Sequence, residues 1–542
     1  MKAFLSKHKL WLTLILIFCI SECLVNPIGN FPLNDDWSYG KPALLLYKTG
    51  KVDIGGFPAM TLLTHLSWGV LFAKLFGFSF TVLRFSTLVS SLIGVMVLNK
   101  LITLMIGNKL TAFILCLTLL FNPIYFNLSN TYMTDVNFNT VLIITCYFSF
   151  VFFTTRSKTA FMLVFIFSTA LVLIRQFGII VPLCFAFSCL FLSSRKFIYT
   201  AFSLVGLLLV IAVLKYYESY LKTVLDTGAA YKFSSGIHLT QRVFWDSVWI
   251  NLTIRYTTIL LHVLVYSFPF VIAFSWQLLK DFKIIIGILA FVGFMVLVLF
   301  LFSEESFPIG NIFINTGVGT ETFHENLIPH SKKFYEHTYS AKVNEVAGLV
   351  KYYLISFSAT CCFLLLLKAV RLRFKLLLQP YLVFLMCLFF SYVFMIVVTE
   401  SYYDRYHIPL ITFMLILFSY AARHYKINYQ LAIVPLLFFF YISVFGTRDY
   451  LELNRKRWEA YAFLKNTLRV DPKKINGGFE VNCWNEGNYS VWYDFLSLEN
   501  YDYLIQFGWE KDFKILREYE FQRYFPFKKD KIYIFVRERK TN

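Results

Sequence analysis

Long apolar runs are the feature that most limits what this chain can fold into. They recur along the 542 residues, and each is about 17 to 25 residues long, enough to cross a bilayer as a helix. Only 15% of the residues are charged, whereas a soluble globular protein carries about a quarter. The sequence therefore predicts a polytopic α-helical membrane protein.

Basic residues in the loops predict how the chain crosses the membrane. Three lysines among the first nine residues precede the first apolar run, which we interpret as an uncleaved signal anchor with a cytoplasmic N-terminus. Residues 58–78 are interrupted by His65 and Lys74, and we expect an interfacial helix there. With that assignment, nearly all later Lys and Arg clusters fall in cytoplasmic loops. The net charge of +19 then reflects contact with anionic lipid, and nucleic-acid binding is not expected.

This topology gives thirteen spans and places the C-terminal region outside the cytoplasm. We expect a transmembrane domain over residues 1–446, with a first outer loop at 27–80, and a small soluble α/β domain over 447–542. We further expect a multi-pass protein of the plasma (inner) membrane. The expected spans are 10–26, 81–105, 110–127, 138–154, 159–174, 177–193, 197–214, 254–275, 283–302, 349–367, 376–397, 408–422 and 429–446.

Short runs rich in β-forming residues predict the strands of the C-terminal domain. They lie at 478–483, 503–507 and 531–536, after a helical pattern at 450–470. Two longer outer loops are expected at 215–254 and 302–349. No internal repeat is evident in the sequence.

Three acidic residues are expected at the outer face, where charge beside lipid is costly and marks candidate function. Asp35 and Asp36 follow the first span, and Asp135 follows the third. Asp35 and Asp135 could instead be N-caps of the helices that begin there. Carboxylates at this depth could hold and deprotonate an attacking hydroxyl or amine.

Two arginines are expected at the same face. Arg175 lies in a very short connection, and Arg405 precedes Tyr406 in an Arg-Tyr-x-x-Pro motif. They could be interfacial anchors, or they could bind a phosphate bidentately and stabilise it as it leaves. With the carboxylates, this second interpretation suits group transfer from a lipid phosphate, although polarity alone would equally suit a transporter.

The order of these motifs resembles that of GT-C glycosyltransferases. An acidic pair in the first outer loop, an interfacial helix, a Thr-Asp motif, an Arg at the fifth-to-sixth turn and a late Arg-Tyr-x-x-Pro are most similar to family 39-like enzymes, the protein O-mannosyltransferases and lipid A aminoarabinose transferases, over about residues 10–446. The pair here is Asp-Asp where the O-mannosyltransferases carry Asp-Glu. Gly55-Gly-Phe-Pro58 stands where the aminoarabinose enzymes carry Lys-Pro-Pro.

The resemblance implies an inverting glycosyltransferase, a hexosyl or pentosyl transferase of the cell envelope. Its donor would be a polyprenyl-phosphate sugar drawn from the membrane lipid, and its acceptor a lipid, a glycan or a protein. It implies that Asp35 and Asp36 form the catalytic motif, with Asp35 slightly preferred as base, and that Asp135 supports the acceptor. Arg405, Arg175 and Tyr406 would bind the donor phosphate. A flippase of lipid-linked sugars and a polysaccharide polymerase are the alternatives.

No cofactor and no metal site are expected. Residues 302–349 contain Glu321, His324, Glu325, His330 and His337, but their spacing matches no helical metal motif. A divalent cation therefore has no ligand motif to support it. Nine of the ten cysteines lie in apolar segments, and no CxxC spacing predicts zinc or disulfides.

The topology makes a prediction of its own. A reporter that is active only outside the cytoplasm, fused after Asn542, should be active, because the odd number of spans brings the C-terminal region out. The same reporter fused in the connection near Arg156 should be silent, and measuring both in intact cells checks the assignment. An inactive reporter at Asn542 would mean that the span count is wrong by one.

Overall fold

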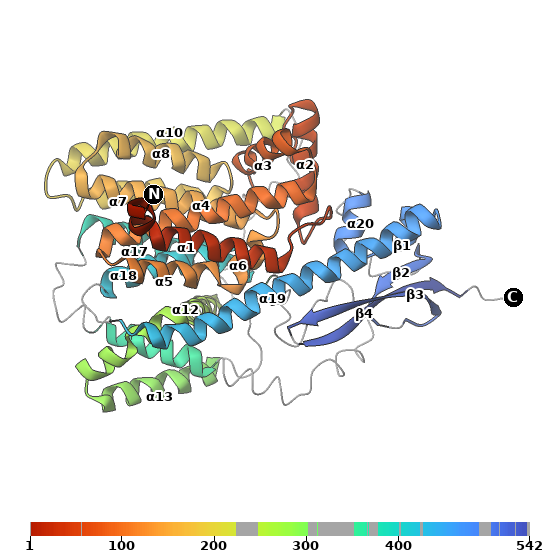
Figure 1. Ribbon diagram of the computed structural model, residues 1–542. Coiled ribbons are helices and arrows are strands. Elements are labelled where there is room, and N and C mark those ends of the chain that lie inside the picture. The colour runs from red at the N-terminus through yellow and green to blue at the C-terminus, as the bar shows by residue number, and fades with distance from the viewer. Residues whose placement is uncertain are drawn as a thin grey trace.

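The computed structural model shows a bundle of long helices with a small sheet at one end (Figure 1). It describes residues 2–55, 57–223, 248–301, 312, 352–365, 367, 378–399, 403–422, 427–486, 500–508, 510–525 and 527–538. The expected outer loop at 302–349, with its His and Glu residues, lies outside the described residues apart from Ile312. So does most of the expected loop at 215–254.

Up to Ala462, the end of α19, most of the described residues lie in helices. The α-helices are α1 Lys2–Val25, α2 Asp36–Thr49, α3 Leu63–Phe76, α4 Phe80–Ile106, α5 Lys109–Leu120, α6 Pro123–Ser129, α7 Thr134–Thr155, α8 Lys158–Val172, α9 Ile180–Cys189, α10 Lys196–Thr223, α12 Val248–Asp281, α13 Ile284–Leu301, α17 Pro380–Val397, α18 His407–Ala422 and α19 Tyr429–Ala462. A further helix is described at Tyr352–Leu365. Short 3₁₀ turns, η1 Gln176–Ile179 and η6 Asp404–Tyr406, precede α9 and α18.

The prediction of a polytopic helical membrane protein is confirmed. Six described helices are long and apolar enough to cross a membrane, or seven when one bent pair is counted as a span. Five more apolar helices are shorter, among them α3 in the segment that we expected to lie at the interface. The number thirteen is not confirmed by the described residues.

One expected span is broken. The run at 110–127 was predicted as one helix, but α5 and α6 meet at a bend of 71°. Pro123 disfavours the helical conformation at the preceding residue, Asn122. The Asn122 side chain instead accepts hydrogen bonds from the backbone N–H groups of Ile124 and Tyr125 and starts a new helix.

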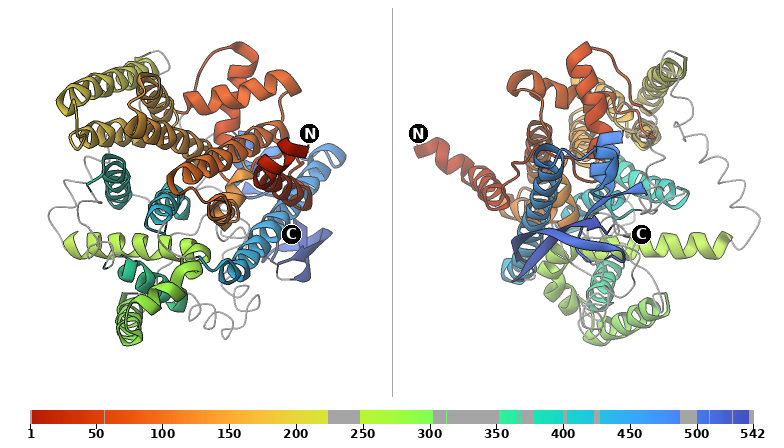
Figure 2. Two further views of the ribbon diagram at one scale, coloured as in Figure 1. Left: turned by 60° about the vertical axis from the view of Figure 1, so that its left-hand side comes forward. Right: turned by 90° about the vertical axis from the view of Figure 1, so that its right-hand side faces the viewer.

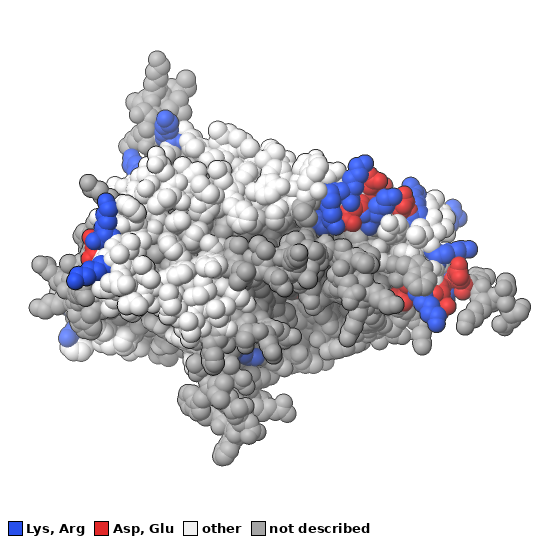
Figure 3. Space-filling view, turned by 90° about the horizontal axis from the view of Figure 1, so that it is seen from below, with Lys and Arg blue, Asp and Glu red and all other residues white. Residues whose placement is uncertain are grey.

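Charged residues on the described surface gather toward the two ends of the bundle. Figure 3 shows most of the Lys, Arg, Asp and Glu side chains of one face near its two ends, with a mostly white stretch between them. On the side of the bundle formed by α10, apolar side chains such as Phe202, Leu208 and Leu209 are more than half exposed. Such a belt suits a bilayer, which would cover these side chains.

The last long helix runs through the expected domain boundary. We predicted a span at 429–446 and a separate helix from 450, but α19 is continuous over 34 residues and passes into a π turn, Phe463–Thr467. Gly446 is the only strong breaker near the boundary, and one glycine costs a helix about 1 kcal/mol. Its neighbours Val444, Thr447 and Asp449 are buried, so packing outweighs that cost. The division of the chain at 446/447 stays a prediction.

A four-stranded sheet lies at the end of α19, facing the viewer in the right-hand view of Figure 2. Its order is β1-β2-β4-β3, with β1 Ile475–Asn476 parallel to β2 Tyr503–Gln506, and with β4 Phe527–Arg537 antiparallel to both β2 and β3 Phe513–Tyr524. The expected strands at 503–507 and 531–536 are thus confirmed in position, and β3 was missed.

The expected strand at 478–483 is wrong, because these residues begin a helix, α20 Phe479–Glu486. Asn482 stabilises the turn before it by accepting a hydrogen bond from the Gly477 backbone and donating one to the Asn476 side chain. Phe479 and Cys483, one helical turn apart, pack together against Trp37. Tertiary contacts therefore override the local β preference.

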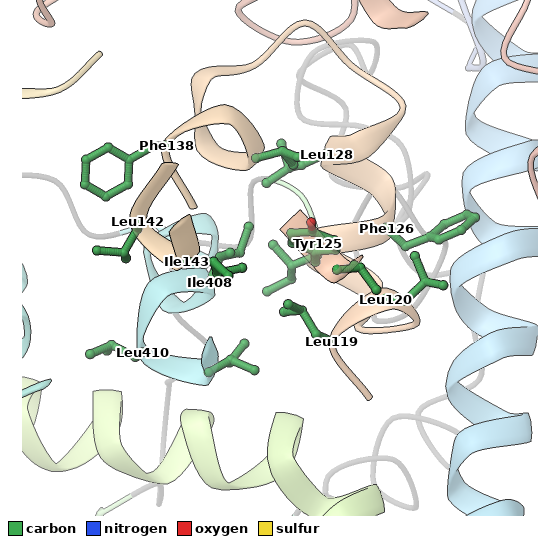
Figure 4. Packing of buried hydrophobic residues seen from close by; sticks show 14 of the residues in the cluster. Leu119, Leu120, Tyr125, Phe126, Leu128, Phe138, Leu142, Ile143, Ile408 and Leu410 are labelled. Carbon is green, nitrogen blue, oxygen red and sulfur yellow. The ribbon is translucent and has the colours of Figure 1, made fainter. Parts of the chain in front are cut away.

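The core lies where α5, α6, α7 and α18 meet. Figure 4 shows Leu119 and Tyr125 from the bent pair beside Ile143 of α7 and Ile408 of α18. Thr412 of α18 also donates a hydrogen bond of 3.0 Å to Asn139 of α7. This packing fixes the start of α7 relative to the start of α18.

Arg84 clamps the chain that leaves α1. It lies on α4, is 1% exposed, and donates hydrogen bonds to the backbone carbonyls of Pro27, Gly29 and Phe31. A charged donor shared among three carbonyls is strong, and the carbonyl of Phe31 is buried with it. Arg84 therefore fixes the path of the segment that leads to Asp35.

Replacing Arg84 should destabilise the protein. Arg84→Met takes the donor from one buried and two partly buried carbonyls, which should cost roughly 3 kcal/mol, so that the detergent-solubilised protein melts several degrees lower. Lys100→Met is the matched control, since Lys100 is exposed on the same helix. Thermal unfolding followed by intrinsic fluorescence measures both, and equal melting temperatures for the two variants would contradict the clamp.

Candidate active site

The acidic pair at the start of α2 divides into one buried and one accessible carboxylate. Asp36 is 1% exposed and accepts hydrogen bonds from the backbone N–H groups of Leu33 (3.2 Å) and Tyr132 (2.8 Å). It thereby ties the start of α2 to the start of α7. Burial raises the pKa of Asp36 to about 8, while nearby Arg84 and the two backbone donors act in the opposite direction.

Asp35 immediately precedes α2 and pairs with an arginine 370 residues away. Its Oδ2 lies 2.9 Å from Nη1 of Arg405, and its side chain is 15% exposed. The N-cap alternative is not supported, because the Asp35 side chain makes no capping hydrogen bond. Its backbone carbonyl accepts from the Ser38 backbone and hydroxyl instead, which leaves the carboxylate for Arg405.

Arg405 is held in the η6 turn, at the point where α18 begins. Its side chain is 7% exposed, and its guanidinium lies over the rings of Tyr403 (5.0 Å) and Tyr406 (5.8 Å). Burial alone would lower the pKa of Arg405, but Asp35 and Asp135 raise it above its ordinary value. A guanidinium this buried is not an exposed interfacial anchor.

A second ion pair, between Arg175 and Asp135, joins the turn before η1 to the first turn of α7. Nη2 of Arg175 lies 2.8 Å from Oδ2 of Asp135, and both side chains are buried. Arg175 also donates from Nε and Nη2 to the Thr134 hydroxyl, at 2.9 and 2.6 Å. Asp135 lies in the first turn of α7, one residue after Thr134, and the cap position is Met133. The N-cap alternative for Asp135 is therefore wrong.

A tight turn between α8 and η1 presents Arg175. The backbone leaves α8 at Val172, and a Cβ on Gly178 would come within 2.8 Å of the backbone of Leu171, so only glycine fits there. The segment before α3 packs on this turn, because the Leu62 N–H donates to the Ile174 carbonyl and the Thr61 hydroxyl to the Val172 carbonyl.

The two ion pairs share one neighbourhood. Tyr39 of α2 is buried, and its hydroxyl interacts electrostatically with the members of both ion pairs: Asp35, Arg405, Arg175 and Asp135. Met60 lies between the two pairs, because its sulfur accepts hydrogen bonds from the hydroxyls of Tyr39 (3.6 Å) and Thr134 (3.5 Å). The structure thus brings together Asp35, Asp135, Arg175, Arg405 and Tyr406, and it sets Asp36 behind them in a backbone contact.

Sequence reasoning did not assign roles to four residues in or beside this site. Thr134 precedes Asp135 in the Thr-Asp motif, and Tyr39 ends the stretch that contains the acidic pair, so their proximity in sequence was a usable signal. Arg84 also carried a signal, because an arginine inside an apolar run is costly and must have a partner. No sequence feature pointed to Met60.

No metal site can be built from the described residues, where no group of three or more His, Cys, Asp and Glu side chains is arranged to hold an ion. Two carboxylates and two guanidiniums form the site instead. This combination can hold an anionic group against the arginines and accept a proton on a carboxylate.

The fold and the site together define a polytopic membrane protein with a buried, charged site at one end of its bundle. Residues 68–216 match the family model described as dolichyl-phosphate-mannose-protein mannosyltransferase. This match confirms, over that stretch, the resemblance to family 39-like GT-C enzymes. The matched residues include Asp135 and Arg175. None of the curated proteins compared with the chain matches it significantly.

Two solved structures are similar to the chain along nearly its whole length. ArnT from Cupriavidus metallidurans in the apo state is 9% identical, covers 98% of both chains and has a TM-score of 0.44. ArnT from the same organism bound to undecaprenyl phosphate is 10% identical, covers 97% of this chain and 98% of that one, and has a TM-score of 0.45.

The raised pKa of Asp36 predicts a pH-dependent stability. An Asp with an unfolded pKa of about 3.9 and a folded pKa of about 8 binds more protons when folded, so stability falls as the pH rises between those values. Asp36→Asn removes this titration. Between pH 5 and 8 the melting temperature of the wild type should fall more steeply than that of Asp36→Asn.

Asp53→Asn, in the connection between α2 and α3, is the control and should keep the wild-type slope. Melting curves over this pH range test the point. Parallel slopes for the wild type and Asp36→Asn would contradict the role of Asp36.

Proposed function

We propose that this chain is an inverting membrane glycosyltransferase that moves a hexose or pentose from a polyprenyl-phosphate donor to an acceptor on the outer face of the plasma (inner) membrane. The observation that carries the proposal is the pairing of an accessible carboxylate, Asp35, with a buried arginine, Arg405, beside a second such pair. The match to a family model for transferases that use dolichyl-phosphate-mannose supports the same chemistry.

Arg405 has a role that follows from its partner. A donor phosphate that enters the site competes with the Asp35 carboxylate for the guanidinium, since both are anions of matching geometry. Arg175 lies in the same neighbourhood and adds a second positive charge, which Thr134 orients. The two arginines would then stabilise the phosphate as negative charge develops on it.

Asp35 would be the general base. When the phosphate takes Arg405, the Asp35 carboxylate is released from its ion pair and is free to contact the acceptor. It accepts the proton of the acceptor hydroxyl or amine, whose oxygen or nitrogen then bonds to the anomeric carbon of the sugar. The bond from that carbon to the phosphate oxygen breaks, and polyprenyl phosphate leaves with the electron pair.

Asp36 and Asp135 would support the reaction without being its general base. The Asp36 carboxylate is occupied by two backbone donors, so we assign it to holding the catalytic segment rather than to proton transfer. Asp135 orients Arg175 and is the second candidate to contact the acceptor. Tyr406 would line the phosphate position through its place beside Arg405. A transporter tends to carry such groups at the middle of the bilayer, whereas these lie at helix starts.

The proposal is tested by turnover. Purified protein given a panel of polyprenyl-phosphate sugars and candidate lipid, glycan and peptide acceptors should release polyprenyl phosphate, measured by mass spectrometry. Asp35→Asn should lower kcat by about 10² or more, the usual contribution of a general base. Because Asp35→Asn also takes the charged partner from buried Arg405, its melting temperature should fall, so kcat is compared at a temperature where both proteins are folded.

Asp53→Asn is the matched control in the same segment and should stay within about twofold of the wild type. Full activity in Asp35→Asn, in Asp36→Asn and in the double variant would rule out the catalytic assignment. Movement of the donor across vesicles without release of polyprenyl phosphate would favour a flippase. Mass spectrometry of the glycans and lipids that change on deletion of the gene would identify the sugar and the acceptor.

A further inference from the structure

A buried ion pair from the C-terminal part of the chain reaches the segment that carries Asp35. Glu480 of α20 accepts a hydrogen bond of 2.8 Å from Nη2 of Arg457 on α19, and both side chains are at most 3% exposed. The other carboxylate oxygen of Glu480 accepts a hydrogen bond of 3.1 Å from the backbone N–H of Asn34. Residues 446 positions apart are therefore joined directly next to Asp35.

Asn34 is held in an unusual conformation at this contact. Its φ is +49°, in the left-handed region, which Asn tolerates better than most residues other than glycine. The Tyr450 hydroxyl of α19 donates a hydrogen bond of 3.4 Å to its side-chain oxygen. Because the backbone at Asn34 sets the direction in which the chain enters Asp35, these contacts set where the Asp35 carboxylate points.

The first two turns of α2 are held from the same side. The Lys41 ammonium donates a hydrogen bond of 2.7 Å to the Cys483 carbonyl of α20. The Trp37 ring meets the Phe479 ring edge-on, with centroids 5.8 Å apart. Figure 1 shows α20 beside α2 at the end of the bundle that carries the site.

A purely stabilising role accounts poorly for this arrangement. Taking two charges out of water costs several kcal/mol per ion, and their attraction and hydrogen bonds repay that cost only partly, so a buried pair contributes little net stability. A pair of apolar side chains would fill the same space. Only a charged or polar acceptor, however, can hold the Asn34 N–H and fix its direction.

We propose that Glu480, anchored by Arg457, is a positioning residue that holds the backbone at Asn34 and so sets Asp35 opposite Arg405. The inference rests on the proposed function. The part of the chain after α19 is therefore required for catalysis, although none of its residues needs to touch the substrate.

Kinetics of Glu480→Gln test the proposal. The amide keeps one acceptor oxygen but turns an NH₂ group toward either Arg457 or the Asn34 N–H, so the segment loses one of its two fixed contacts. We expect kcat to fall about tenfold to a hundredfold, as misplacement of a catalytic group does, with the donor KM within about threefold. Glu480→Asp, which keeps the charge, should recover part of kcat.

Glu459→Gln is the matched control. It makes the same chemical change on α19, where Glu459 is half exposed and pairs with Lys456, and its kcat should equal that of the wild type. A kcat for Glu480→Gln equal to that of Glu459→Gln would overturn the proposal while leaving the proposed function standing. So would an equal loss of kcat in Glu480→Asp and Glu480→Gln.

Amide hydrogen exchange gives a readout that does not depend on turnover. Exchange at residues 31–38 should be faster in Glu480→Gln than in Glu459→Gln, with exchange in α4 unchanged. If Glu480→Gln does not fold, the double variant Arg457→Gln/Glu480→Gln leaves no unpaired buried charge and should show the same faster exchange. Unchanged exchange at 31–38 overturns the proposal even if no donor supports turnover, and absence of turnover in the wild type counts against the proposed function alone.

Discussion

Charge that is buried next to lipid must bring its own partner, and the site depends on this constraint. Arg405 and Arg175 are each about 6% exposed, and each lies within 3 Å of a carboxylate from a distant part of the chain. An unpaired guanidinium at that depth would cost several kcal/mol. The two pairs therefore hold together the starts of α2, α7 and α18 and the turn before η1. A ligand anion can enter only by taking over one of these partnerships.

Much of this organisation was predictable from the sequence. The long apolar runs predicted a helical membrane protein. The acidic and basic residues beside those runs predicted the members of the two ion pairs, because a charged residue in apolar surroundings is costly. Which residue pairs with which was not predictable, since Asp35 and Arg405 meet only through the packing of α7 against α18. The same holds for the different environments of Asp35 and Asp36, which are adjacent in sequence but differ in exposure because one faces the start of α7.

The sequence misled where local preference and tertiary contact disagreed. Residues 478–483 are rich in β-forming side chains, yet they form α20 because Phe479 and Cys483 pack on Trp37. The run at 110–127 is apolar enough for one span, yet Asn122 and Pro123 bend it. Both of these elements lie near the site, since α20 contacts α2 and α6 contacts α7. The bend also gives α6 the short, buried form that carries Asn127 to its contact with Thr447 of α19.

The unbroken course of α19 has a consequence for how the chain can vary. One rigid helix joins its lipid-facing first half to Tyr450 and Arg457, and through them to α20. An α-helix turns by about 100° and advances about 1.5 Å for each residue. A single residue inserted or deleted near Gly446 would therefore swing everything beyond it around the helix axis and aim Glu480 away from Asn34. A change by a whole turn would restore that direction but still shift Glu480 along the axis by about 5.4 Å, so this helix has a fixed length, whereas a flexible linker between two domains would accept many lengths.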